Sequence, residues 1–328
     1  MPKDVSSRPR YAARLNAFKS SIEPGKKATV ENLIACAGKV GGLDAADLNY
    51  PDHFTDHAPA ALAAILEDNS MALNGLAMRY YTNPGFKLGA FTHPDKKVRQ
   101  AAVDITKKGI DALCEMGGSL MTLWMGQDGF DYSFQGDYAK MWNNNIEALR
   151  QVADHNRDVD IAIEYKPNEP RAFALMPDVA TTLLAIRESE RPNLGVTLDF
   201  AHVLYADEMP AHAAHLVARH SRLLGVHLND GYAKRDDGLM VGSVHPVQTV
   251  ELLVALEHMD YDGVIYFDTF PDQGGLNAIE EARTNLLMAM KLRAVAKSLS
   301  ANTELEEAIA RQDATASMRV VAQALYRE

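Results

Sequence analysis

Four residues able to bind a metal ion each stand where a short apolar run ends. These residues are Glu164, Asp199, His227 and Asp268, and each run has the length of one buried strand. If the runs are parallel strands of one barrel, their carboxyl ends meet on one face and the four side chains converge. Three carboxylates so close would repel one another, and a divalent cation between them removes that repulsion. The pattern therefore predicts a metal site.

The ligand types indicate which ions this site would take. Carboxylate oxygens with one imidazole suit Mn²⁺, Mg²⁺ or Co²⁺, with Zn²⁺ as a further option, and the lack of cysteine argues against a structural zinc. Taken singly, each carboxylate has an ordinary alternative as a helix cap or an ion-pair partner. Four of them in register favour a shared cation.

A second polar group lies near the first in the sequence. His202 comes three residues after Asp199, and Asp236 lies in the loop after the next strand. These two side chains could hold a second cation, so that the chain carries one or two ions. The alternative is a solvated loop whose carboxylates pair with neighbouring Lys and Arg side chains.

Aromatic residues supply candidate walls for such a site. Trp124, Phe91 and Tyr81 follow predicted strands and would line it with apolar surface. The alternative for each is ordinary core or loop packing.

The elements that must position these residues alternate as strand and helix. Eight short runs are expected as strands, at 11–18, 43–49, 71–78, 119–124, 160–164, 194–199, 223–228 and 264–268. Helices are expected at 29–39, 59–67, 95–116, 138–156, 178–190, 211–220, 246–259 and 277–298. This alternation favours an α/β fold, a closed (β/α)8 TIM barrel, over an open doubly wound sheet. We expect the barrel to span residues 1–299 and a C-terminal helical extension to span 300–328 and contact another subunit.

Composition limits the partners of the protein. The 328-residue chain is 47% hydrophobic and has a formal net charge of -11, which disfavours nucleic acid or an anionic membrane as a partner. Cys36 and Cys114 fall in helix-like patterns and suit reduced thiols of a cytoplasmic protein. No apolar stretch reaches the length of a membrane span. A small molecule that is neutral or metal-bound is the expected partner.

Five segments carry a resemblance to a known family. They are 89–92 (GAFT), 123–129 (LWMGQDG), 164–171 (EYKPNEPR), 199–202 (DFAH) and 227–230 (HLND). In this order they resemble the xylose isomerase-like TIM barrel superfamily, and EYKPNEPR is similar to the motif of xylose isomerases. The resemblance implies that Glu164 binds metal and that Lys166 contacts a substrate oxygen. It also implies that Trp124 and Phe91 close the pocket.

Other positions depart from xylose isomerases. That family carries Glu at Asp199 and Asp at His227, whereas bacterial L-rhamnose isomerases resemble this chain at both. By that likeness Asp199, His202 and His227 supply two metal sites, and Asp268 is the last ligand. Gly238 stands where a further acidic ligand is expected. Ketose 3-epimerases of the superfamily have Glu in place of Asp268 and no Lys at the position of Lys166, which favours an isomerase.

These residues predict an aldose–ketose isomerase that acts on an open-chain monosaccharide by a metal-assisted hydride shift. Lys166 would stabilise charge on oxygen, and Asp236 would help the second metal to make a bound water basic. The alternative is a ketose epimerase that uses an enediol, with Glu164 and Asp268 as its acid–base pair. A DNA-cleaving member of the superfamily is disfavoured by the acidic charge. Beside Trp124 and Phe91, the residues expected to bind the sugar are His53, His93 and Asn229, and the expected assembly is a homodimer or homotetramer.

Overall fold

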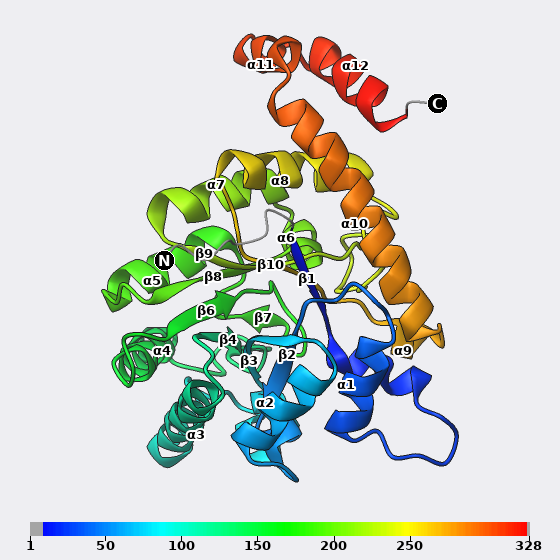
Figure 1. Ribbon diagram of the computed structural model, residues 1–328. Helices are drawn as coiled ribbons and strands as arrows, with labels where there is room; N and C mark the ends of the chain where they lie inside the picture. Colours follow the sequence, from blue (N-terminus) through cyan, green and yellow to red (C-terminus); the bar gives the residue numbers. More distant parts are fainter. Residues whose placement is uncertain (1–8, 327–328) are drawn as a thin grey trace, which may run out of the picture.

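Eight parallel strands form a closed barrel in the computed structural model, which describes residues 9–326 (Figure 1). Around the barrel the strand order is β1-β10-β9-β8-β6-β4-β3-β2, and β1 closes the ring by pairing with both β10 and β2. The predicted TIM barrel is therefore confirmed. The barrel strands are β1 (Arg10–Ala13), β2 (Ala45–Tyr50), β3 (Ala72–Met78), β4 (Leu120–Trp124), β6 (Asp160–Glu164), β8 (Leu194–Asp199), β9 (Leu223–His227) and β10 (Val264–Phe267).

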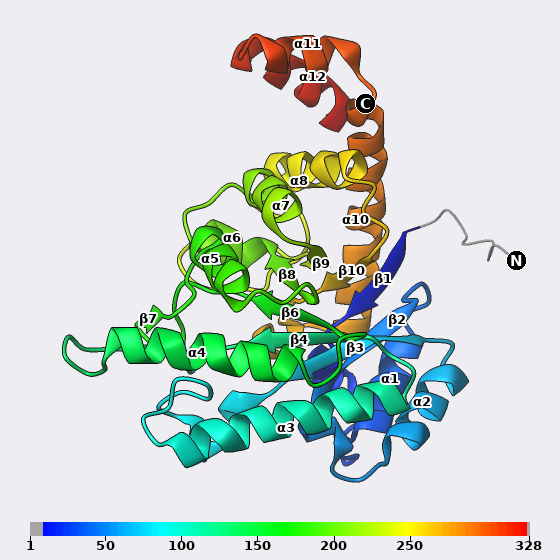
Figure 2. The same cartoon turned by 90° about the vertical axis from the view of Figure 1, so that its left-hand side faces the viewer.

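Helices surround the barrel and cover its outer face, as Figures 1 and 2 show. Their apolar sides pack on the strands in one continuous hydrophobic core, while a separate small cluster of Ala12, Ala45, Val264 and Tyr266 lies among the barrel strands. Each predicted helix is present within a few residues of its expected bounds. The outer helices are α1 (Val30–Gly38), α2 (Pro59–Asp68), α3 (Lys96–Glu115), α4 (Tyr138–Ala153), α5 (Val179–Ser189), α7 (Pro210–His220), α8 (Pro246–His258) and α10 (Ala278–Ser300).

The first strand is shorter than the sequence predicts. After Ala13 the chain turns into a 3-10 helix, η1 (Leu15–Ser21), so the expected strand over 11–18 is wrong in its second half. Leu15 and Phe18 are both buried, and their spacing of three fits one face of a helix rather than the alternation of a strand.

Two short strands outside the barrel tie together the loops that follow β4 and β6. The strands β5 (Gly129–Phe130) and β7 (Phe173–Ala174) pair in an antiparallel manner. Gly129 is needed there, because a Cβ at this position would collide with the carbonyl oxygen of Phe173. The pairing connects the chain after Trp124 with the chain after Lys166.

The C-terminal extension forms two helices, α11 (Thr303–Ala310) and α12 (Ala314–Leu325), that project past the barrel at the end of α10 (Figure 1). Leu305 and Val320 are buried within it, whereas Ile309 and Met318 are exposed. Within residues 9–326, no helix has both the length and the apolar character required to cross a bilayer.

Candidate metal centre

The four predicted ligands meet at the carboxyl end of the barrel. Glu164, Asp199 and His227 are the last residues of β6, β8 and β9, and Asp268 directly follows β10. These four strands are consecutive neighbours in the barrel, and Asp199 pairs in register with His227. One ligand atom from each side chain lies within 4.8 Å of the others. Strand order therefore brings together residues as distant in sequence as Glu164 and Asp268.

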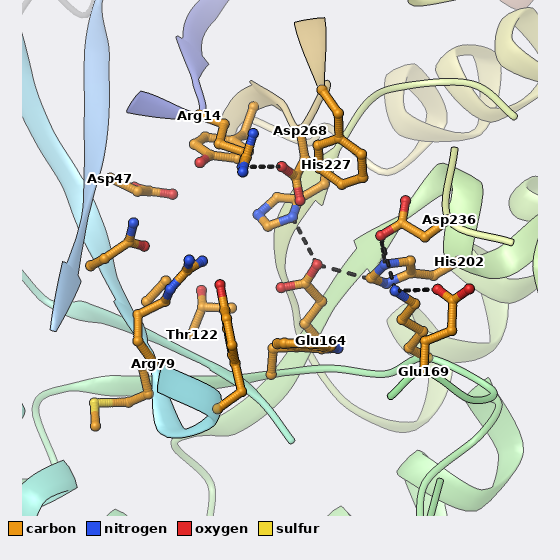
Figure 3. A pocket seen from close by; sticks show the side chains of 18 of the residues that line it. Arg14, Asp47, Arg79, Thr122, Glu164, Glu169, His202, His227, Asp236 and Asp268 are labelled. Carbon is orange, nitrogen blue, oxygen red and sulfur yellow. Dashed lines mark hydrogen bonds and ion pairs between the residues drawn. The ribbon is translucent and has the colours of Figure 1, made fainter. Parts of the chain in front are cut away.

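Contacts within this cluster suit a divalent cation. His227 Nδ1 lies 3.1 Å from Glu164 Oε1, a contact drawn in Figure 3. The same nitrogen lies 3.8 Å from Asp199 Oδ2, so it faces two carboxylates. Asp268 Oδ1 is buried and has no hydrogen-bond partner, although Arg14 Nε lies 3.8 Å from it. The three carboxylates and one imidazole form a donor set that fits Mn²⁺, Mg²⁺ or Co²⁺.

The proton affinities of this cluster reflect its crowding. Burial alone would lower the pKa of His227, but the carboxylates of Glu164, Asp268 and Asp199 outweigh burial and raise it to about 10. Burial raises the pKa of Asp268 to about 7, against the attraction of His227 and Arg14. Burial likewise raises the pKa of Asp199. A divalent cation would take over the charge compensation that protons provide here.

Asn229 organises this cluster. Its Nδ2 donates to both carboxylate oxygens of Asp199, at 3.2 and 3.1 Å, and to the backbone oxygen of Asp268 at 3.0 Å. Its Oδ1 accepts the amide hydrogen of Ala201, and the side chain is fully buried. The sequence predicted a sugar contact for Asn229, but the structure places it behind the ligands, where it holds two of them.

The second predicted group is assembled around a lysine. His202 Nε2 lies 3.2 Å from Asp236 Oδ2, and Lys166 Nζ reaches the same oxygen at 3.1 Å and Glu169 Oε2 at 2.9 Å. Burial would raise the pKa of Asp236, but His202 and Lys166 lower it overall. In the part of the chain that the structure describes, the cluster around Glu164 is the single group with metal-ligand spacing. His202 and Asp236 are therefore in contact, as the sequence suggested, but the ammonium group of Lys166 lies at the place predicted for a second cation.

A cavity of about 420 Å³ opens beside both groups. Trp124 and Tyr81 form an aromatic wall, with ring centroids 5.0 Å apart, and Lys166 Nζ lies 5.4 Å from the Trp124 ring. Trp124 thus faces the cavity as predicted. The volume is in the range of small-molecule sites. Residues that line the cavity include Arg14, Asp47, Asn49, Arg79, Thr122, Glu164, Lys166, Glu169, His202, His227, Asp236, Tyr266 and Asp268.

Three predicted substrate contacts lie elsewhere. Phe91 is 0% exposed and packs edge-on against Tyr80, with ring centroids 5.6 Å apart, so it belongs to the core rather than to the cavity wall. His53 borders a separate depression, and its Nδ1 accepts the amide hydrogen of Asn49. His93 Nδ1 accepts the amide hydrogen of Asp95 in the turn before α3. These three side chains do not line the cavity, because Phe91 is buried in the core, His53 lies in the 3-10 helix after β2 and His93 lies in the turn before α3.

Sequence reasoning did not single out the wall opposite the predicted ligands. Arg14 follows β1, Asp47 lies within β2 and Arg79 follows β3, and all three line the cavity (Figure 3). The sequence did contain a sign of this wall. Asp47 and Asn49 are polar residues two positions apart in an otherwise apolar strand, and every second residue of a barrel strand points inwards.

Comparisons with known proteins agree with this architecture. The family model described as "Xylose isomerase-like TIM barrel" matches residues 39–291. Xylose isomerases of Thermus thermophilus and Thermus caldophilus are each 29% identical over 241 residues, which cover 70% of this chain and 62% of the relative. The chain thus spans less than two thirds of the length of these relatives.

Solved structures with the same fold have low sequence identity. A D-tagatose 3-epimerase-like protein has a TM-score of 0.69 at 16% identity, covering 86% of this chain and 98% of that one. An L-ribulose 3-epimerase has a TM-score of 0.69 at 17% identity, covering 90% and 99%. D-allulose 3-epimerase from Methylomonas sp. in complex with D-allulose has a TM-score of 0.66 at 16% identity, covering 87% and 97%. Identities at this level show a common fold.

Proposed function

Because the chain belongs to the xylose isomerase-like TIM barrel family, we propose that it is a divalent-metal-dependent enzyme that epimerises or isomerises an open-chain monosaccharide by proton transfer through an enediol. Support comes from the cluster at the cavity, where two carboxyl groups, Glu164 and Asp268, border the same space. It also comes from the fold shared with ketose 3-epimerases, one of which is in complex with D-allulose. This is the function that the geometry supports best.

Glu164 and Asp268 would divide the proton transfers between them. One carboxylate takes a proton from the carbon next to the carbonyl, and the other carboxyl group returns a proton to the same carbon or its neighbour. When bound, the divalent cation supplies Lewis-acid polarisation of the sugar carbonyl. Lys166, held by Asp236 and Glu169, is placed to stabilise negative charge on a substrate oxygen. Trp124 and Tyr81 would keep water from the reacting carbons.

The second candidate is the aldose–ketose isomerase with a hydride shift. It is favoured by the similarity to xylose isomerases and by the proximity of His202 and Asp236, which could serve a second ion. That ion would have to displace Lys166 from Asp236 Oδ2. The single-cluster arrangement needs no such rearrangement, and for this reason we place proton transfer first.

Deuterium incorporation separates these two mechanisms. Metal-loaded protein would be incubated in heavy water with ketopentoses, ketohexoses and the corresponding aldoses, in the presence of Mn²⁺, Mg²⁺ or Co²⁺, and followed by NMR. We expect sugar interconversion with deuterium at the carbon next to the carbonyl, and deuterium at C3 for a 3-epimerase. Interconversion without deuterium would identify the hydride shift instead. No conversion of any sugar with any of the three metals would refute both candidates.

We further propose that α11 and α12 contribute to a homodimer or homotetramer. Ile309 and Met318 on these helices are 60% and 47% exposed, which is high for large apolar side chains on a projecting helical pair. The double variant Ile309→Asp with Met318→Asp should shift the protein towards monomer in sedimentation velocity. An unchanged sedimentation coefficient would exclude this surface as the contact.

A further inference from the structure

A buried carboxyl group on the far wall of the cavity has no part in the proposed chemistry. Asp47 lines the cavity and is only 8% exposed, yet its Oδ1 is buried without a hydrogen-bond partner. Figure 3 shows Asp47 across the cavity from Glu164, with its carboxylate directed towards His227. A buried polar atom without a partner costs free energy, so its place beside an open cavity points to a ligand that completes it.

The backbone of β2 and β3 directs Asp47 inwards. Pairing between these strands shifts after Ala46, so that Ala46 pairs with Leu73 and Asp47 pairs with Gly75, which leaves Asn74 as an extra residue. Such a bulge redirects side chains at the rim of a barrel. Asn74 and Gly75 also donate hydrogen bonds to the Asp47 carboxylate. The side chain is therefore held at the cavity wall by its neighbours, while Oδ1 has no hydrogen-bond partner.

Other roles for Asp47 have less support. It is not part of the cluster formed by Glu164, Asp199, His227 and Asp268. A purely structural carboxylate would have both oxygens satisfied by protein donors, as in Asp128, where one oxygen accepts from the Ala90 amide and the other from Thr92.

We propose that Asp47 accepts a hydrogen bond from a hydroxyl group of the sugar, at a carbon remote from the one bound between Glu164 and Asp268. This inference rests on the proposed function and names the substrate class, a neutral sugar with a free hydroxyl at that carbon. A hydroxyl group can donate to Asp47 and accept from Arg79, which lines the same cavity. A phosphate or carboxylate at that carbon would meet the negative charge of Asp47 at close range.

Binding of unreactive alditols tests the inference without any need for turnover. Xylitol, ribitol, arabinitol, sorbitol, mannitol and galactitol would be titrated calorimetrically into Mn²⁺-loaded protein, together with a terminal-deoxy and a terminal-phosphate form of the best ligand. Asp47→Leu and Asp47→Asn would be compared with wild type. Asp104→Asn is the charge-matched control, since Asp104 lies on α3, outside the cavity, and its carboxylate accepts a hydrogen bond from Gln100.

We expect the best alditol to bind Asp47→Leu about 10- to 100-fold more weakly than wild type, with Asp104→Asn unchanged. We expect wild type to prefer the hydroxylated over the deoxy ligand by a similar factor, and Asp47→Leu to lose that preference. Metal-free Asp47→Asn keeps an acceptor for Asn74 and Gly75, and it should be at least as stable to heat as wild type because a buried charge has been removed. A structural role for that charge would lower the melting temperature of this variant.

Several results would overturn the inference. These are unchanged alditol affinity in both Asp47 variants, absence of alditol binding to wild type, or tighter binding of the phosphate form. Loss of one Mn²⁺ equivalent in Asp47→Asn would identify Asp47 as a metal ligand instead. If Asp47-dependent alditol binding is found but no sugar is converted, the inference stands and the proposed function fails. If sugars are converted with unchanged constants in Asp47→Leu, the proposed function stands and the inference fails.

Discussion

Replacing Asp268 with Asn should stabilise the metal-free protein and abolish its stabilisation by metal. In the metal-free protein, burial raises the pKa of Asp268 to about 7 from its ordinary value of 3.8. A carboxyl group with a raised pKa destabilises the fold at a pH above that value, and the destabilisation disappears as the pH falls below the unfolded pKa. Asn cannot ionise, so the variant escapes this cost.

The size of the first effect follows from the pKa shift, and the size of the second follows from mass action. A rise of about three pKa units corresponds to about 4 kcal/mol as an upper bound. Because the Asp268 side chain is 19% exposed, solvent screening reduces this bound, and we expect a net gain of about 1–2 kcal/mol at pH 8, or about 2–3 °C. For wild type, Mn²⁺ at about 100 times Kd adds about 2.7 kcal/mol, which is about 4 °C for 328 residues.

The assay is thermal unfolding followed by circular dichroism, at pH 8 and pH 5, with and without Mn²⁺. The gain of Asp268→Asn over wild type should shrink from pH 8 to pH 5, and its melting temperature should rise by less than about 1 °C with Mn²⁺. Asp272→Asn is the matched control, since Asp272 also binds Arg14, at 2.9 Å, but lies outside the cluster. The reasoning is refuted if Mn²⁺ stabilises Asp268→Asn as much as wild type, or if the metal-free variant is less stable.

Three further predictions follow from other contacts. Burial lowers the pKa of His53 to about 4, so the free energy of unfolding should fall by about 3 kcal/mol as the pH drops from about 6.5 to 4. In urea titrations over this pH range, His53→Asn should lose less free energy of unfolding than wild type, and equal losses would contradict this. Lys166→Met removes the ammonium group that forms an ion pair with Asp236, and it should lower kcat about 100-fold in the NMR assay. A change in KM alone would indicate a role in binding only. Asn229→Ala removes the amide that donates a hydrogen bond to Asp199. It should weaken Mn²⁺ binding, measured by calorimetry, about 10- to 100-fold. An unchanged Mn²⁺ affinity would show that the amide is dispensable.

The sequence alone predicted the barrel and the four residues of the cluster. Strand runs and helical periodicity are local properties, and eight alternations leave few architectures open. In a parallel barrel every strand end lies on the same face, so Glu164, Asp199, His227 and Asp268 could be placed together from their positions in the runs. The family resemblance agreed with this arrangement.

Tertiary structure decided what the loops and the far wall contribute. Phe91 and His93 lie in a long loop whose path depends on contacts such as the Thr92–Asp128 hydrogen bonds, 36 residues apart in sequence, which no local pattern encodes. Asp47 required the shifted pairing of two strands before its orientation could be known. Local periodicity determines elements, but the direction of a loop or of a bulged side chain depends on packing between segments that are distant in sequence.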